Sequence, residues 1–188
     1  MERVAIDALA PDDLGGTRRR DLATALSTTD LAVNHYDVPL AGRLPGGLHA
    51  HADQEELFVV VEGTATFETY RDGTGEAVTV AAKEPVRFAP GEFQSGRNGA
   101  DEPLVVLALG APGETTDVRL PLVCPACDRR DVRLDEGRLV CPDCGTTREP
   151  APCPDCGAES LDVTLGPGDD PVVVCRDCGS SYESPPTR

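Results

Sequence analysis

The sequence has no tryptophan, one methionine and one lysine, and aromatic residues make up only 4% of its 188 positions. It has no apolar stretch near the ~20 residues that a membrane-spanning helix needs, so we expect no membrane partner. Residues 1–7 lack the basic start and apolar core of a secretory signal, which predicts a cytoplasmic protein. A chain of this length has room for one main domain of about 120 residues plus small appendages.

Positive charge is scarce. Acids number 33 against 17 bases, which gives a formal net charge of −16, and Lys83 is the only lysine. Phosphate contacts need a basic surface and weaken with salt, so the composition argues against nucleic acid as a main partner. Few aromatic residues are also typical of disordered chains, but 39% hydrophobic residues and regular strand patterns favour a folded protein. We therefore predict an acidic, halophilic protein whose surface carboxylates keep it hydrated in concentrated salt.

Helical patterns are nearly absent. Residues 1–30 form a polar lead-in with one short helix expected near 21–26. Residues 31–40 alternate like a strand, which places Tyr36 on the apolar face and leaves His35 on the other as an ordinary exposed histidine. Further short β-rich segments, separated by Gly/Pro turns, follow at 64–70, 76–82, 86–89 and 104–109. This spacing is typical of an antiparallel sandwich or barrel.

One segment carries two histidines two positions apart. His49 and His51 point to the same face if the segment is extended, and Glu56 opens the β-rich run that ends at Gly63. If the two runs pair as a hairpin, the carboxylate returns toward both imidazoles. Two histidines and one carboxylate form a metal site with open coordination positions, although His-x-His alone also occurs as two incidental polar residues.

This segment resembles the first sequence motif of the cupin superfamily. The two histidines, the glutamate and the glycine of that motif are matched by His49, His51, Glu56 and Gly63. Residues 88–98 are similar to the second cupin motif; Gly91 and Asn98 match, and the proline sits one place late. The resemblance covers roughly residues 30–112. It implies a jelly-roll fold, a small-molecule ligand in the pocket and a divalent ion (Fe, Mn, Ni or Zn) on the two histidines and the glutamate.

Gln94 stands where the family usually carries its last metal-binding histidine. The resemblance therefore implies that Gln94 is either a weak fourth ligand or a hydrogen-bond donor beside the ligands. The opposing hypothesis is a pocket that has abandoned metal, in which Gln94 contacts a polar ligand or simply lines the wall.

Cysteine is absent from residues 1–123 and dense afterwards. All eight cysteines form four Cys-x-x-Cys pairs, namely Cys124/Cys127, Cys141/Cys144, Cys153/Cys156 and Cys175/Cys178. Residues 131–140 and 161–174 each predict a short hairpin between two pairs. Each half is too small to bury its own core, so a structural Cys₄ zinc would supply its folding energy. The alternatives are disulfides, rubredoxin-type iron, and a metal site shared by the two middle Cys-x-x-Cys turns (knuckles), Cys141/Cys144 and Cys153/Cys156.

The sequence thus predicts an all-β chain: a cupin jelly-roll (double-stranded β-helix) sandwich over 1–120, a first zinc ribbon over 121–150 and a second over 151–188. We expect a metal-binding module that holds a small ligand or docks on a protein partner, with a homodimer as one form of association. The alternative is a metal-dependent enzyme of the dioxygenase, isomerase or decarboxylase type, acting on a small organic acid or sugar.

The charge imbalance generates a first prediction. Thirty-three acids on a small surface repel one another most at low ionic strength, where the Debye length is long (about 10 Å at 0.1 M). The melting temperature should therefore rise between 0.1 M and molar KCl, measured by calorimetry. A melting temperature that does not change with salt would remove the halophile hypothesis.

Overall fold

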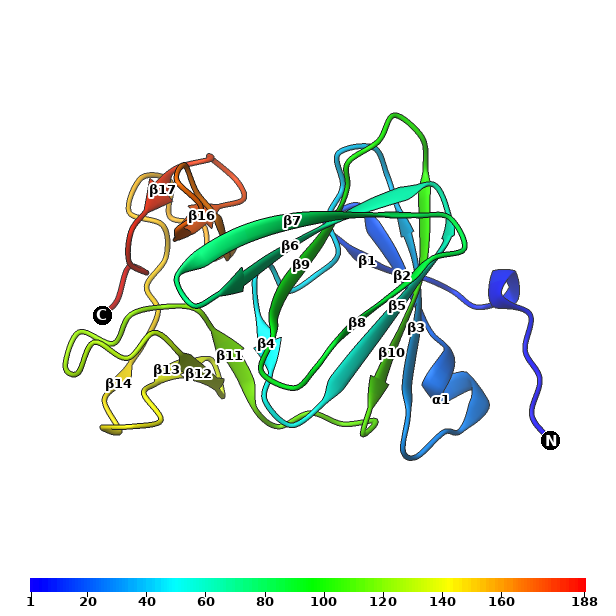
Figure 1. Cartoon of the computed structure of the whole chain (residues 1–188), viewed down its shortest axis with the longest axis horizontal. Helices are drawn as coiled ribbons and strands as arrows, with labels where there is room; N and C mark the ends of the chain where they lie inside the picture. Colours follow the sequence, from blue (N-terminus) through cyan, green and yellow to red (C-terminus); the bar gives the residue numbers. More distant parts are fainter.

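The computed structural model describes all residues, 1–188, and is almost entirely β (Figure 1). The N-terminal part is a sandwich of two antiparallel sheets. The larger sheet has the order β1 (Asp12–Leu14), β2 (Thr17–Asp21), β3 (Ala32–Val38), β10 (Leu104–Ala111), β5 (Glu55–Glu62) and β8 (Pro85–Phe88). The smaller sheet has the order β7 (Thr74–Ala81), β6 (Thr64–Arg71) and β9 (Phe93–Asn98). Its β6–β7 turn places Asp72 and Gly73 at positive φ (51° and 84°), as the Asp-Gly pair predicts.

The core between the two sheets contains inward-facing residues of both. Phe67, on the small sheet, is fully buried and packs its ring against Phe58 and Phe88 of the large sheet, at centroid distances of 5.0 and 5.6 Å. Twelve buried residues share this core. The sandwich therefore has an apolar interior of its own, which the strand alternation predicted.

The lead-in contains a 3₁₀ turn (Ile6–Ala8) and one short helix, α1 (Leu22–Leu26). Asp21 caps the helix, because its carboxylate accepts the backbone N–H of Thr24 at 2.9 Å. The expectation of an exposed His35 is wrong. His35 lies on β3 between Arg20 of β2 and Leu107 of β10, is half-buried, and its Nδ1 is sealed from solvent. No helix in the structure has the length and hydrophobicity to cross a membrane.

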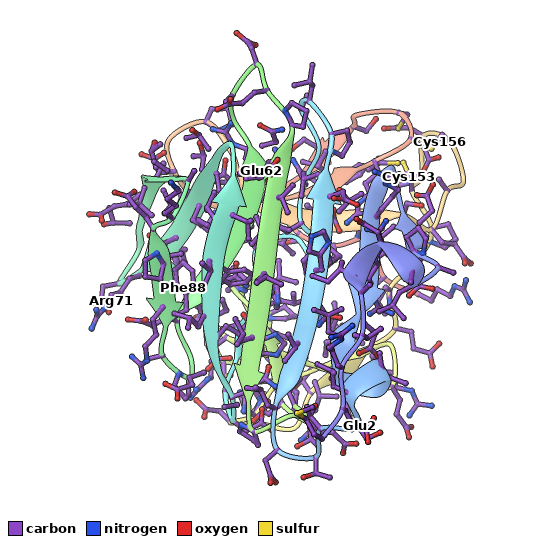
Figure 2. All side chains as sticks on the ribbon, turned by 90° about the vertical axis from the view of Figure 1, so that its right-hand side faces the viewer. Glu2, Glu62, Arg71, Phe88, Cys153 and Cys156 are labelled. Carbon is purple, nitrogen blue, oxygen red and sulfur yellow. The ribbon has the colours of Figure 1, made fainter.

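The cysteine-rich region forms two small β modules beside one end of the sandwich (Figure 1). The first comprises β12 (Val132–Asp135), β13 (Arg138–Val140) and β14 (Thr147–Arg148), and the second β15 (Leu161–Leu165), β16 (Pro171–Cys175) and β17 (Ser181–Tyr182). Figure 2 looks onto the large sheet, with the second module, marked by Cys153 and Cys156, on its far side. The two hairpins match the prediction.

The segment that joins the sandwich to the first module contains a strand of its own. Residues Val118–Leu120 form strand β11, which pairs with β12 on one edge and with β4 (Ala50–His51) of the sandwich on the other. One five-stranded sheet, β14-β13-β12-β11-β4, therefore runs from the first module into the sandwich. A second buried core joins the two modules to the sandwich and consists of Leu48, Tyr70, Leu122, Val132, Leu139, Val163 and Val173.

Replacing Phe67 by alanine should lower the free energy of unfolding by about 3–5 kcal/mol, because the change opens a cavity at the centre of the sandwich. Val78 is the matched control: it faces Phe67 in the β6–β7 register but is 43% exposed. Val78→Ala should cost far less. Urea unfolding compares the two, and equal losses would contradict this description of the core.

Candidate metal centre

Two short segments bring the predicted ligands together, but not as a hairpin. His49 and His51 lie at β4, which is bonded to β11 and, through an isolated bridge between His49 and Gln94, to β9. Glu56 lies on β5, between β10 and β8 of the large sheet. The predicted pairing of the two runs is therefore wrong; the carboxylate reaches the imidazoles across the interior of the sandwich. One ligand atom from each of the three residues lies within 4.8 Å of the others.

In each imidazole, Nδ1 is used as a hydrogen-bond donor to a neighbouring residue. His49 Nδ1 lies 2.9 Å from the carbonyl oxygen of Gly47, an obligate acceptor, so this nitrogen donates. His51 Nδ1 lies 3.2 Å from the Thr115 hydroxyl, and that hydroxyl donates to Asp53 at 2.6 Å. Because Thr115 gives its proton to Asp53, its oxygen accepts from His51. Both rings thus turn Nε2 inward as a lone-pair donor, the arrangement that metal-ligating histidines adopt.

The two Nε2 atoms face each other at 3.2 Å. Two lone pairs at that distance repel unless a proton or a cation lies between them. Burial, the largest influence, lowers the pKa of His49, so the neutral ring is favoured and a cation is the better solution. Glu56 Oε1 lies 3.5 Å from His51 Nε2 and adds the anionic oxygen. The donor set fits a divalent ion such as Mn, Fe, Ni or Zn.

Gln94 is buried and points its amide at the carboxylate. Its Nε2 donates to Glu56 Oε2 at 2.8 Å, which leaves Oε1 of Glu56 for the ion. Burial raises the pKa of Glu56, but the neighbouring imidazoles and the Gln94 donor outweigh it and lower that pKa overall, as a cation at the same place would. Of the two roles that the sequence left open, this geometry favours the hydrogen-bond donor.

Three supporting residues were not found from the sequence. Thr115 and Asp53 orient His51, and the Thr115 and Thr116 hydrogen bonds hold the pKa of Asp53 at about 2. Gln54 is buried and donates to the carbonyl of Pro112. Thr115 is 64 positions from His51, so no local spacing signals their contact.

A cavity of about 380 Å³ opens beside these residues. That volume suits a small organic molecule. Phe58 contributes an apolar wall, and Arg19, Asn34 and Tyr36 contribute polar groups. Burial raises the pKa of Tyr36 to about 12, so its phenol keeps its proton and can donate to a ligand.

The structure gathers the eight cysteines into two sets of four, Cys124/Cys127/Cys141/Cys144 and Cys153/Cys156/Cys175/Cys178. None forms a disulfide. Sulfur–sulfur distances between opposite knuckles are 3.5–3.7 Å. A zinc tetrahedron with bonds of about 2.3 Å has edges of about 3.8 Å, so both sets fit that ion.

The knuckles are shaped for thiolates. Gly145, Gly157, Gly179 and Asp128 all take positive φ directly after a cysteine, as the sequence predicted. A hydrogen bond from Thr146 lowers the pKa of Cys144 to about 6, and one from Tyr182 lowers that of Cys153 to about 6. The thiolate, which is the metal-binding form, is thus favoured near neutral pH at Cys144 and Cys153, whereas contacts with neighbouring thiols raise the pKa of Cys127 and Cys156 to about 12.

No protein-family model and no curated protein matches the sequence. Solved structures match in fold. They include the polyketide cyclase RemF from Streptomyces resistomycificus (TM-score 0.55, 22% identity, covering 66% of this chain and 88% of that one). A conserved protein with a double-stranded β-helix domain from Klebsiella pneumoniae also matches (TM-score 0.51, 18% identity, 62% and 94%).

Oxalate decarboxylase from Lactobacillus farciminis matches with a TM-score of 0.51 and 17% identity over 58% of this chain, which spans only 33% of the decarboxylase. These identities show the fold alone. The N-terminal sandwich is the double-stranded β-helix of cupins, followed by two small Cys₄ modules that fit zinc.

Metal affinity should respond to Gln94 and Glu56 in opposite directions. Gln94→His adds a third imidazole and should tighten Mn(II) binding on the order of tenfold, whereas Glu56→Gln removes the anionic ligand and should weaken it on the order of tenfold to a hundredfold. Titration followed by electron paramagnetic resonance measures both. His35→Ala is the control, since His35 lies outside the cluster. Equal affinities in all four proteins would contradict the ligand assignment.

Proposed function

We propose that this protein binds a divalent metal ion in its cupin pocket on His49, His51 and Glu56, and uses the ion to capture a small anionic ligand. The observation that carries the proposal is the pair of inward Nε2 atoms, 3.2 Å apart, with each Nδ1 engaged elsewhere. Three protein ligands leave coordination positions open for the ligand.

The charge of the site supports an anion. A divalent ion and the Glu56 carboxylate sum to one positive charge. Arg19 also lines the cavity, but Asp12 pairs with it at 2.8 Å, so the net positive charge of the site comes from the ion. Tyr36 adds a phenol that donates. A small carboxylate can therefore place one oxygen on the ion and be held by the polar wall.

Two structural zinc ions complete the proposal, one in each Cys₄ module, hereafter called ribbon 1 (residues 121–150) and ribbon 2 (residues 151–188). Four thiolates close each site, as in structural rather than catalytic zinc centres. The ribbons place their buried apolar residues against this chain's own sandwich. That use of apolar surface favours small-ligand binding over docking on a separate protein.

A metal-dependent enzyme acting on a small organic acid is the second candidate, favoured by the Tyr36 phenol that holds its proton in the cavity. The test is carbon-13 NMR of labelled small carboxylic acids, oxalate among them, after incubation with Mn(II)-loaded or Fe(II)-loaded protein and removal of the metal with a chelator. A time-dependent loss of one acid that Tyr36→Phe slows would support catalysis. Unchanged spectra would leave a binding protein.

The main proposal predicts metal-dependent anion binding. Mn(II) should bind the wild type and His35→Ala alike, and the double variant His49→Ala/His51→Ala at least on the order of tenfold more weakly. Oxalate should then change the Mn(II) resonance spectrum of the wild type. If no Mn(II), Fe(II) or Ni(II) binds the wild type more tightly than the double variant, the pocket is not a metal site.

A further inference from the structure

The strand that carries the histidines has two faces. His49 and His51 point into the pocket, while Leu48 and Ala50, next to them in sequence, point away and are 0% and 1% exposed. Such alternation follows from the two-residue period of a strand. What covers Leu48 and Ala50 therefore also fixes the height and tilt of the imidazoles on the opposite face.

Ribbon 1 holds one edge of this strand. Strand β11, directly before ribbon 1, pairs Arg119 with Ala50 and Val118 with His51. The backbone N–H of Ala52 donates to Asp117 at 2.8 Å. On its other edge β11 pairs with β12 of ribbon 1 over three residues, so the sheet of the ribbon ends on the strand that carries His51.

Ribbon 2 holds the start of the same segment. The backbone N–H of Leu48 donates to the carbonyl of Val163 on β15 at 2.7 Å. A Cβ on Gly47 would lie 2.8 Å from that same carbonyl oxygen, so the two backbones are in close contact. Gly47 in turn accepts the Nδ1 hydrogen bond of His49. Ribbon 2 is thus one backbone contact away from the residue that orients His49.

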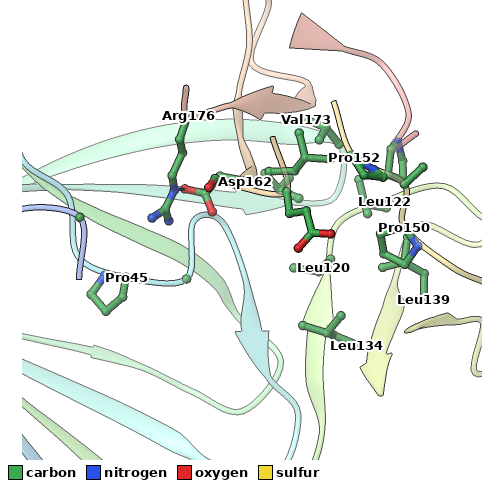
Figure 3. A pocket seen from close by; sticks show the side chains of 18 of the residues that line it. Pro45, Leu120, Leu122, Leu134, Leu139, Pro150, Pro152, Asp162, Val173 and Arg176 are labelled. Atoms are coloured by element: carbon green, nitrogen blue, oxygen red, sulfur yellow. Dashed lines mark hydrogen bonds and ion pairs between the residues drawn. The ribbon is translucent and has the colours of Figure 1, made fainter. Parts of the chain in front are cut away.

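The second site strand is supported in the same way. Phe93 packs against the core that joins the ribbons to the sandwich, while its neighbour Gln94 faces the cavity. Around these contacts a larger cavity of about 740 Å³ separates the ribbons from the sandwich, with Pro45 on one side and Leu122 and Val173 on the other (Figure 3). The ribbons therefore support the histidine segment at Leu48 and at the β4–β11 edge, while β9 holds it on the sandwich side through the paired backbone hydrogen bonds of His49 and Gln94.

We propose that the two ribbons are intramolecular positioning elements for the pocket, so that zinc in the Cys₄ sites determines how tightly the pocket holds its own ion. A ribbon without zinc is too small to stay folded. Its loss releases one edge of the 48–52 segment and exposes Leu48, and the imidazoles lose their fixed geometry. The metal-affinity part rests on the proposed function; the positioning part does not.

The first test uses ribbon variants that leave the sandwich sequence unchanged. Cys144→Ser removes an exposed ligand from ribbon 1, and Cys178→Ser removes one from ribbon 2. Asp177→Ser is the matched control, since it changes the neighbouring exposed residue in the same knuckle. Elemental analysis should show one zinc lost in each cysteine variant and none in the control.

Amide hydrogen exchange by NMR is the readout that needs no pocket metal. Cys178→Ser should accelerate exchange at Leu48 and Cys144→Ser at Ala52, each by tenfold or more (on the order of the loss of one stable hydrogen bond). Val106, a buried core residue of β10, reports whether the sandwich stays folded and should not change. Loss of zinc with unchanged exchange at Leu48 and Ala52 would overturn the positioning role.

The second readout is Mn(II) affinity, because this hard ion prefers the histidine–carboxylate site to thiolates. Each cysteine variant should bind Mn(II) on the order of tenfold more weakly than Asp177→Ser, the usual effect of removing a group that orients a ligand. Equal Mn(II) affinity after zinc loss would contradict the coupling while leaving the pocket metal intact. Absence of Mn(II) binding in the wild type would instead contradict the proposed function.

Discussion

The structure depends on one short segment, residues 48–51, whose two faces lie in different environments. In residues 48–51 the side chains alternate between a buried apolar core and a polar cavity. Leu48 needs a dry cover, and His49 and His51 need fixed partners for Nδ1. The sandwich alone supplies the cavity side. Most of the cover on the other side comes from residues more than 70 positions away, in the Cys₄ modules, and Tyr70 and Phe93 of the sandwich complete it.

The chemistry of the pocket follows from the same arrangement. Burial lowers the pKa of His49 and keeps its ring neutral, while Gln94 and His51 keep Glu56 ionised despite its burial. Two inward-facing ring nitrogens and one carboxylate, gathered within 4.8 Å, form an electron-rich cluster that a cation stabilises. Of the 33 acidic residues, only Glu56 belongs to this cluster.

Short-range sequence patterns predicted the features that depend on neighbouring residues. Strand alternation gave the sandwich, Asp-Gly and the glycines after cysteines gave the tight turns, and Cys-x-x-Cys spacing gave the two gathered sets of thiols. Contacts between residues far apart in the sequence could not be predicted from these patterns. His51 and Thr115 are too far apart in the sequence for any local pattern to indicate their hydrogen bond. Strand β11 has only three residues, too few for an alternation pattern to be recognised. The hairpin between the histidines and Glu56 failed because closeness in sequence does not determine which strands pair.

Anomalous X-ray diffraction from a crystal of the full chain, grown with Mn(II), measures all three sites together. The account predicts a zinc peak inside each Cys₄ set and a manganese peak among His49 Nε2, His51 Nε2 and Glu56 Oε1, with Leu48 still bonded to Val163. Two zinc peaks with no third peak in the pocket, or a manganese peak elsewhere, would contradict it.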